Sequence, residues 1–233
     1  LIPAAIIYKQ ILEMTGAEML WVPGIRMCDG IAADYAEKQK YLKFTHNFDD
    51  DILSASRNMA KRYRCNTSHG QKIENYALQI FDAMKKFHGL GTRERLLLRI
   101  ASILHDCGKF ISLRDSSACA YNIIMATEII GLSHAEREIV AEVVRCNLDA
   151  FRYGEGSIRA GKLTAMLRLA NAMDRSHHGR LDDGKLQVKG NKLIISTSYA
   201  GNLALETIAV EDKADFFEEM FGIRPEIRQK RRV

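Results

Sequence analysis

A long series of amphipathic helical patterns between residues 49 and 174 constrains the fold of this chain more than any other feature. Apolar residues recur there at intervals of three and four, as in Ile73, Tyr76, Ala77, Ile80 and Met84. This spacing places apolar side chains on one face of a helix. We predict helices over 49–63, 68–87, 92–104, 118–130, 134–146 and 162–174. The fold class is therefore predicted to be mainly α, a helical bundle.

The apolar period changes after Gly179. Residues 185–188 and 193–197 alternate apolar and polar side chains around Lys189-Gly190-Asn191, which predicts a β-hairpin. We further predict a third strand over 205–210, a helix over 212–221 and a strand over 223–227. A small α+β element over 182–233 is thus expected to follow a helical domain over 41–181.

The first 40 residues have a different organisation. The pattern predicts a helix over 3–15, a short apolar strand over 17–22, a turn at Pro23-Gly24 and a helix from Asp29 to about Lys40. Such a helix–strand–helix unit is too small to fold alone, and the chain begins at Leu1 rather than Met. We therefore expect residues 1–40 to be the end of a domain in a longer protein.

Composition limits the function classes. Of 233 residues, 47% are hydrophobic and 27% charged, as in a globular protein. No run of 18 apolar residues is present, so we predict no membrane span. The net charge of +5 permits polyanion binding but is mild for a dedicated nucleic-acid binder. Five irregularly spaced cysteines argue against a disulfide scaffold and suit the cytoplasm.

Four residues form a candidate metal site. His105 and Asp106 are adjacent at the end of a predicted helix, His69 lies near the start of an earlier one, and Asp174 ends a later one. Imidazole and carboxylate ligands together suit Mn, Fe, Zn or Mg. The alternative is a buried hydrogen-bonded cluster without metal, because a buried carboxylate needs some partner.

The order His69, His105-Asp106, Asp174 resembles the HD-domain fold, in which these four positions ring a metal inside a helical bundle. The stretches 93–111 (RERLLLRIASILHDCGKFI) and 161–177 (GKLTAMLRLANAMDRSH) resemble the C-terminal HD-like region of the exopolyphosphatase/guanosine pentaphosphate phosphohydrolase (Ppx/GppA) family. Residues 1–35 and 216–223 also resemble parts of that family, so the resemblance covers nearly the whole chain.

The resemblance implies an HD-domain-like helical bundle preceded by the remnant of an actin-like (ribonuclease H-like) domain at residues 1–40. The family hydrolyses the terminal phosphate of polyphosphate or pppGpp in a Mg-dependent cleft between two actin-like lobes, which this chain lacks. Its C-terminal region supplies polyphosphate-binding surface and dimer contacts. Expected partners are therefore inorganic polyphosphate or guanosine penta/tetraphosphate and a second copy of the chain, with a divalent metal at the HD site.

The sequence also departs from the family. Ser116-Ser117-Ala118-Cys119-Ala120 stands where many relatives carry a run of histidines, and Asn147 stands where many carry His. The histidines that could hold a second metal or contact phosphate in those relatives are thus missing, while His69, His105, Asp106 and Asp174 remain.

Three functions stay open. The first is binding of polyphosphate or a nucleotide together with dimerisation, with phosphate contacts from four cationic residues: Lys109, Arg114, Arg145 and Arg175. The second is a metal-dependent phosphohydrolase at the HD site, in which Lys109 stabilises charge on the phosphate. The third is a dimerisation module without ligand. The alternative for each of these four cations is an ordinary surface charge that contacts no phosphate. His177 and His178 are expected at the surface.

Overall fold

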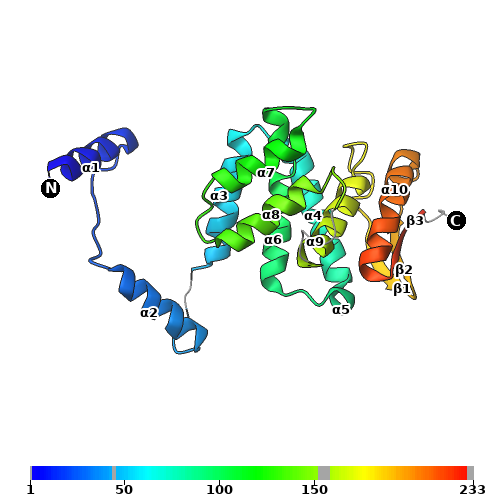
Figure 1. The fold of residues 1–233 in the computed structure, drawn as a ribbon, viewed down its shortest axis with the longest axis horizontal. Coiled ribbons are helices and arrows are strands. Elements are labelled where there is room, and N and C mark those ends of the chain that lie inside the picture. The colour runs from blue at the N-terminus through cyan, green and yellow to red at the C-terminus, as the bar shows by residue number, and fades with distance from the viewer. Residues whose placement is uncertain (1, 44–45, 152–157, 230–233) are drawn as a thin grey trace. The chain divides into compact units, whose positions relative to one another are not determined.

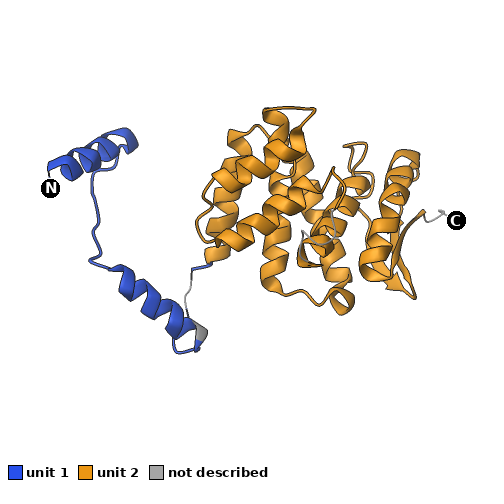
Figure 2. Ribbon diagram, viewed as in Figure 1, with its two compact units in different colours: residues 1–47 blue, residues 48–233 orange. Residues whose placement is uncertain are grey.

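The computed structural model describes residues 2–43, 46–151 and 158–229. The chain divides into two compact units, residues 1–47 and residues 48–233 (Figure 2). Each unit is described by itself below. No helix among the described residues is long and apolar enough to cross a membrane.

The first unit contains two helices, α1 (Ile2–Thr15) and α2 (Met27–Lys38). Both predicted helices are therefore formed. Helix α1 buries none of its residues, and large apolar side chains such as Ile6 and Trp21 are exposed. The strand predicted over 17–22 is wrong for this chain. A strand needs a neighbour for its backbone hydrogen bonds, and residues 2–43 contain none.

The second unit is mainly helical, as the apolar period predicts, with a small sheet at its C-terminal end (Figure 1). Its elements follow in chain order: α3 (Phe48–Arg62), α4 (Thr67–Ala83), α5 (Lys85–His88), α6 (Thr92–Leu104), the short 3₁₀ helix η1 (Cys107–Phe110), α7 (Ser116–Ala126), α8 (His134–Arg145), α9 (Ile158–Met173), β1 (Lys185–Lys189), β2 (Lys192–Thr197), α10 (Ala204–Phe221) and β3 (Arg224–Gln229).

Helix α9 lies at the centre of this unit. It packs against α4, α6, α8 and α10, and apolar side chains on all of its faces are buried, among them Leu163, Met166, Leu169 and Met173. A helix that is apolar all round is stable only inside a core. Its C-terminal end therefore delivers the next residue, Asp174, into the interior of the bundle.

The sheet has the order β1-β2-β3. Strands β1 and β2 form the predicted hairpin, and Gly190 in its turn has a φ of 57°, a left-handed conformation that favours glycine. Strand β3 pairs with β2 in parallel, which requires a crossover between them, and α10 is that crossover. Pro225 is tolerated because β3 lies at the edge of the sheet.

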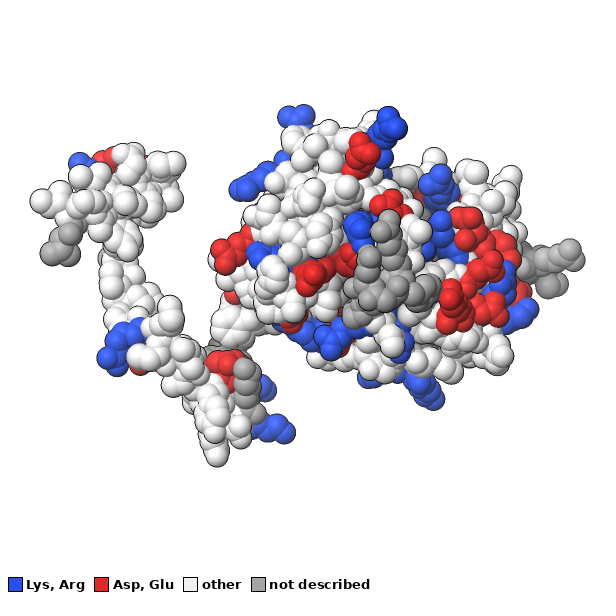
Figure 3. Space-filling model, viewed as in Figure 1, with Lys and Arg blue, Asp and Glu red and all other residues white. Residues whose placement is uncertain are grey.

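The strand predicted over 205–210 is wrong, because these residues lie inside α10. The buried residues of this helix are Glu206, Val210, Ala214 and Phe217, spaced by four, four and three. The helical period thus begins at Ala204, earlier than the apolar run alone indicates. On the face shown in Figure 3, acidic side chains gather over α10. Arg224 pairs with three of its acidic residues, Glu211, Asp215 and Glu218.

The N-terminus of α8 is fixed by a charged network. Ser133 and Glu136 form a capping box, and Arg93 donates two hydrogen bonds to the Glu136 carboxylate, at 2.6 and 3.0 Å. These bonds, mainly those from Arg93, lower the pKa of Glu136 to about 2 against the raising effect of partial burial. The network ties α8 to α6.

We predict that Glu136→Gln lowers the free energy of unfolding at pH 7 by about 1–2 kcal/mol, since an ionised acceptor is lost. The folded-state pKa lies below the unfolded value. The carboxylate's contribution is therefore complete above about pH 4.5 and is lost as the pH falls towards 2. Urea unfolding at pH 7 and pH 3 measures both effects. The exposed Glu138 of the same helix gives the control Glu138→Gln; equal destabilisation by both variants at pH 7 would contradict the prediction.

Candidate metal centre

The four predicted ligands come together from three separate helices. His69 lies in the first turn of α4, where its backbone N–H donates to the side chain of the N-cap residue Asn66 at 3.2 Å. His105 follows the last residue of α6, and Asp106 precedes η1. Asp174 follows the last residue of α9. The rings of His69 and His105 lie 5.2 Å apart between centroids.

His105 is held in an orientation that suits a metal ligand. Its Nδ1 lies 2.7 Å from the carbonyl oxygen of Ser102, one turn earlier in α6, and an N–H donor there leaves a lone pair on Nε2. Nε2 is buried and has no hydrogen-bond partner among the described residues. Burial lowers the pKa of His105, which keeps the imidazole neutral. A neutral imidazole with a free Nε2 is the form that binds metals.

Asp174 links two elements that are far apart in the sequence. Its Oδ2 lies 2.8 Å from Nδ1 of His69, and its Oδ1 accepts a hydrogen bond from the backbone N–H of Gly179 at 2.8 Å. Burial would raise the pKa of Asp174, but these two hydrogen bonds outweigh it and the net shift is downward. The residue therefore stays ionised inside the bundle and orients the ring of His69.

Asp106 is the most accessible of the four. Its Oδ1 lies 3.5 Å from Nε2 of His105 and 2.6 Å from Nζ of Lys109. Burial raises its pKa, but His105 and Lys109 outweigh that effect and lower it.

Gly108 has a steric role beside Asp106, because a Cβ there would lie 1.8 Å from the carbonyl oxygen of Ser116. Only glycine lets α7 pack this closely on η1.

The donor set fits a divalent metal. One ligand atom each from His69, His105 and Asp106 lies within 4.8 Å of the others, the separation expected around a single ion. The orphaned Nε2 of His105 is the observation that tests this fit, because a buried nitrogen without a partner is costly and a metal bond would satisfy it. His69, His105 and Asp106 could hold the ion, with Asp174 either binding it or orienting His69.

His177 lies beside this cluster, although it was expected only at the surface. Its ring is exposed, but it stacks on the ring of His69 at 3.8 Å between centroids. His177, His69 and Asp174 form a second trio whose ligand atoms lie within 4.8 Å of one another. Sequence reasoning missed it because neighbouring histidines in a turn give no periodic signal.

The predicted phosphate contacts do not gather around the cluster. Lys109 contacts Asp106, but Arg114 is exposed on the connection before α7. Arg145 pairs with Glu142 and lies over the ring of Tyr121. Arg175 lines a different cavity of about 370 Å³, between α9 and α10, together with Arg168 and Lys213. Of the four cations, the structure brings Lys109 to the metal ligands.

A cavity opens beside Asp106. It has a volume of about 340 Å³ and is lined by Tyr63, Arg64, Cys65, Asn66, Asp106, Lys109 and Phe110. Arg64 and Asn66 lie in the connection between α3 and α4, and sequence reasoning did not select them. Two cations and an amide thus line the same cavity as one carboxylate of the candidate metal centre. The cavity thus offers donors for an anionic ligand within reach of the metal ligands.

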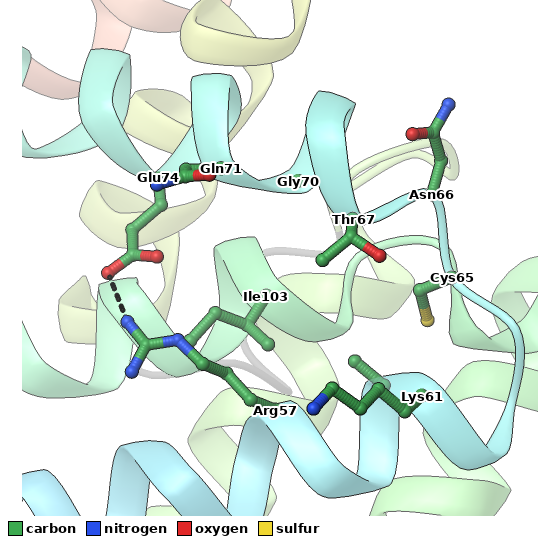
Figure 4. Close-up of a pocket in the computed structure, with 10 residues that line it drawn as sticks. Arg57, Lys61, Cys65, Asn66, Thr67, Gly70, Gln71, Glu74 and Ile103 are labelled. Carbon is green, nitrogen blue, oxygen red and sulfur yellow. Dashed lines mark ion pairs between the residues drawn. The ribbon is translucent and has the colours of Figure 1, made fainter.

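A neighbouring cavity between α3 and α4 has a volume of about 260 Å³ and shares Cys65 and Asn66 with the cavity beside Asp106 (Figure 4). Glu74 in its wall is paired with Arg57 at 3.5 Å and with Arg99 at 2.9 Å. Its charge is therefore already neutralised. None of the four predicted metal ligands lines this cavity, so it is separate from the candidate centre.

A family model described as Ppx/GppA phosphatase, domain III, matches residues 53–206, which include all four predicted ligands. The chain belongs to the Ppx/GppA phosphatase family. A curated relative supports this: the guanosine-5'-triphosphate,3'-diphosphate pyrophosphatase of Photobacterium profundum is 22% identical over 200 residues. The alignment covers 83% of this chain but 39% of the relative. The Ppx/GppA chain described here thus spans well under half the length of that protein.

We predict that Asp174→Asn lowers the free energy of unfolding by about 1.5–3 kcal/mol in the presence of EDTA, because His69 loses a charged, buried partner. The amide keeps the size of the side chain, so the change isolates the charge. Denaturant unfolding of the Ppx/GppA chain measures the effect. Asp115→Asn, at an exposed aspartate, serves as control; a loss for Asp174→Asn no larger than for this control would contradict the role of the pair.

Proposed function

We propose that this chain, as the C-terminal region of a Ppx/GppA-family phosphatase, binds one divalent metal at His69, His105 and Asp106, with Asp174 as a further ligand or as the residue that orients His69. A phosphoanhydride chain binds beside the metal. The observation that carries the proposal is the buried Nε2 of His105, which makes no hydrogen bond among the described residues and lies next to a second imidazole and a carboxylate. A vestigial cluster without ligand would be expected to satisfy this nitrogen internally.

The metal half of the proposal rests on the donor set and its support. Two imidazoles with carboxylates favour Mn, Fe or Zn and also admit Mg. The carbonyl of Ser102 and the carboxylate of Asp174 fix the two rings through their other nitrogens, as outer partners of metal-binding histidines do. A bound ion would polarise a phosphoryl oxygen and acidify a bound water.

The phosphate half rests on the cavity beside Asp106. Lys109 lines it from η1 and Arg64 from the connection between α3 and α4, and Asn66 adds amide donors. An ammonium and a guanidinium match the charge of a phosphate chain, and the guanidinium can donate two parallel hydrogen bonds to phosphate oxygens. The printed name of the Photobacterium relative, a guanosine-5'-triphosphate,3'-diphosphate pyrophosphatase, supports this ligand class. Inorganic polyphosphate and guanosine penta/tetraphosphate are the proposed ligands.

Hydrolysis at this site is a second candidate function. The contact between Lys109 and Asp106 favours it, since it places a cation where a phosphate held next to Asp106 would develop negative charge. Metal-dependent release of orthophosphate from tripolyphosphate, lost in Asp106→Asn, would favour hydrolysis. Binding of tripolyphosphate without release of orthophosphate would show that the site binds the ligand but does not hydrolyse it.

Three other expectations remain predictions from the resemblance: a homodimer, a Mg-dependent phosphatase cleft in two actin-like lobes, and an HD-domain-like fold of the bundle. A location in the cytoplasm remains a prediction from the irregularly spaced cysteines.

We predict that the purified chain, dialysed against equimolar Mn, Fe and Zn, retains about one equivalent of divalent metal. His105→Ala and Asp106→Ala should each reduce this to background, because each removes a ligand. Mass spectrometry of the metal content measures the result. His134→Ala, at an exposed histidine on α8, is the matched control and should retain the metal. Background metal in the wild-type chain would overturn the proposal.

We predict that Lys109→Gln and Arg64→Gln each weaken binding of tripolyphosphate by about 10–100-fold, the equivalent of one charge-assisted hydrogen bond. Titration calorimetry with Mn²⁺ present measures the affinity. Lys86→Gln, at an exposed lysine of α5, is the control for a general charge effect. Removal of the metal with EDTA should also weaken binding. An affinity that is indifferent to both variants and to EDTA would place the ligand elsewhere.

A further inference from the structure

The turn after α9 folds back over Asp174. The backbone N–H of His177 donates to the carbonyl oxygen of Asp174 at 2.9 Å, and the N–H of Gly179 donates to its carboxylate at 2.8 Å. These two bonds wind residues 174–179 around the end of the helix. His177 has a φ of 59° in this turn, a conformation that is uncommon for residues other than glycine. Such a backbone conformation costs about 1 kcal/mol or more, and residues with this strain are often found at functional sites.

This backbone conformation places the His177 ring against the metal ligands. The ring stacks on His69 with an angle of 28° between the planes, and a ligand atom of His177 lies within 4.8 Å of one on His69 and one on Asp174. Among the described residues, none forms a hydrogen bond with the ring of His177. A third imidazole, exposed on its outer side, therefore lies next to the cluster, and its nitrogens make no hydrogen bond among the described residues.

We propose that His177 is an additional ligand of the metal centre, moving from its stacked position to bind the ion from the solvent side. The inference rests on the proposed function, because it requires a metal at the cluster. A rotation of its side chain gives up the stacking contact alone, since the ring has no hydrogen bond to break among the described residues. The site then has three imidazoles and carboxylates, a nitrogen-rich set that favours Zn²⁺, Co²⁺ or Fe²⁺ over Mg²⁺.

His178 provides a matched comparison. It is the next residue, it is also an exposed histidine, and its Nδ1 lies 2.5 Å from the carbonyl oxygen of Ser176. It belongs to neither trio of ligand atoms that the described residues form. A general effect of removing a histidine from this turn would therefore appear equally at both positions, whereas loss of a ligand would appear at His177 alone.

The experiment measures Zn²⁺ and Co²⁺ affinity of the whole chain by competition with a chromophoric chelator, and records the visible spectrum of the Co²⁺-bound form. Three variants at His177 and His178 are compared with wild type. His177→Asn keeps a residue that accepts a left-handed backbone, His177→Phe keeps an aromatic ring for stacking on His69, and His178→Ala is the control. Circular dichroism confirms that each variant is folded.

We expect His177→Asn and His177→Phe to bind Zn²⁺ and Co²⁺ at least about 10-fold more weakly, with an altered Co²⁺ spectrum, while His178→Ala stays within about twofold of wild type. Wild-type affinity and spectrum in both His177 variants would overturn the inference and leave the proposed metal site standing. Restored affinity in His177→Phe alone would overturn it in favour of a stacking role. Absence of metal binding by the wild-type chain would overturn the proposed function and this inference together.

Discussion

The hydrogen bond between His69 and Asp174 connects the parts of the structure on which the candidate site depends. It joins the first turn of α4 to the residue after α9 across 105 residues of sequence, with both side chains almost fully buried. A carboxylate in such a position needs compensation, and it finds it in the imidazole and in the N–H of Gly179. The bond therefore fixes the end of the central helix, one imidazole of the cluster and the turn that carries His177.

The packing of α9 makes this bond possible. Its apolar faces are covered by α4, α6, α8 and α10, so the helix cannot slide or rotate without exposing core residues. Helix α10 packs on α9, and β3, paired with β2, packs on α10, so that the three elements form one crossover unit. The small sheet thus contributes to the site indirectly, by holding a helix that ends at Asp174. Membership of the Ppx/GppA phosphatase family gives this bundle its evolutionary context.

The two carboxylates of the cluster differ in burial and in the groups that balance their charge. Asp174 is fully enclosed and has both oxygens engaged, while Asp106 is partly accessible, is paired with Lys109 and faces a cavity with Arg64. The inner carboxylate therefore supports the histidines, and the outer one lies where a ligand from solvent can reach it. This division of roles between two carboxylates supports binding of both a metal and an anion at one end of the bundle.

Much of the fold follows from local pattern, because helices and hairpins are specified by neighbours in sequence. The helical period predicted α4, and its apolar residues Ile73, Tyr76 and Ile80 are all buried. The hairpin around Gly190 and the capping box of α8 were likewise predictable from a few adjacent residues. The strand over 205–210 was predicted wrongly, because a short apolar run fits a strand and a helix equally well. Packing on α9 decided for the helix.

The order of four residues along the predicted helices was enough to select them as candidate ligands: His69, His105, Asp106 and Asp174. The stretches around them were enough to find the family resemblance. How these residues are used depends on the packing of the helices. This packing placed Lys109 beside Asp106 while leaving Arg114, Arg145 and Arg175 elsewhere, and it brought in Arg64 and His177, which no periodic pattern marks. The reason is physical: a periodic pattern specifies which face of a helix is buried, whereas contacts between a turn and a distant helix depend on how the whole core packs.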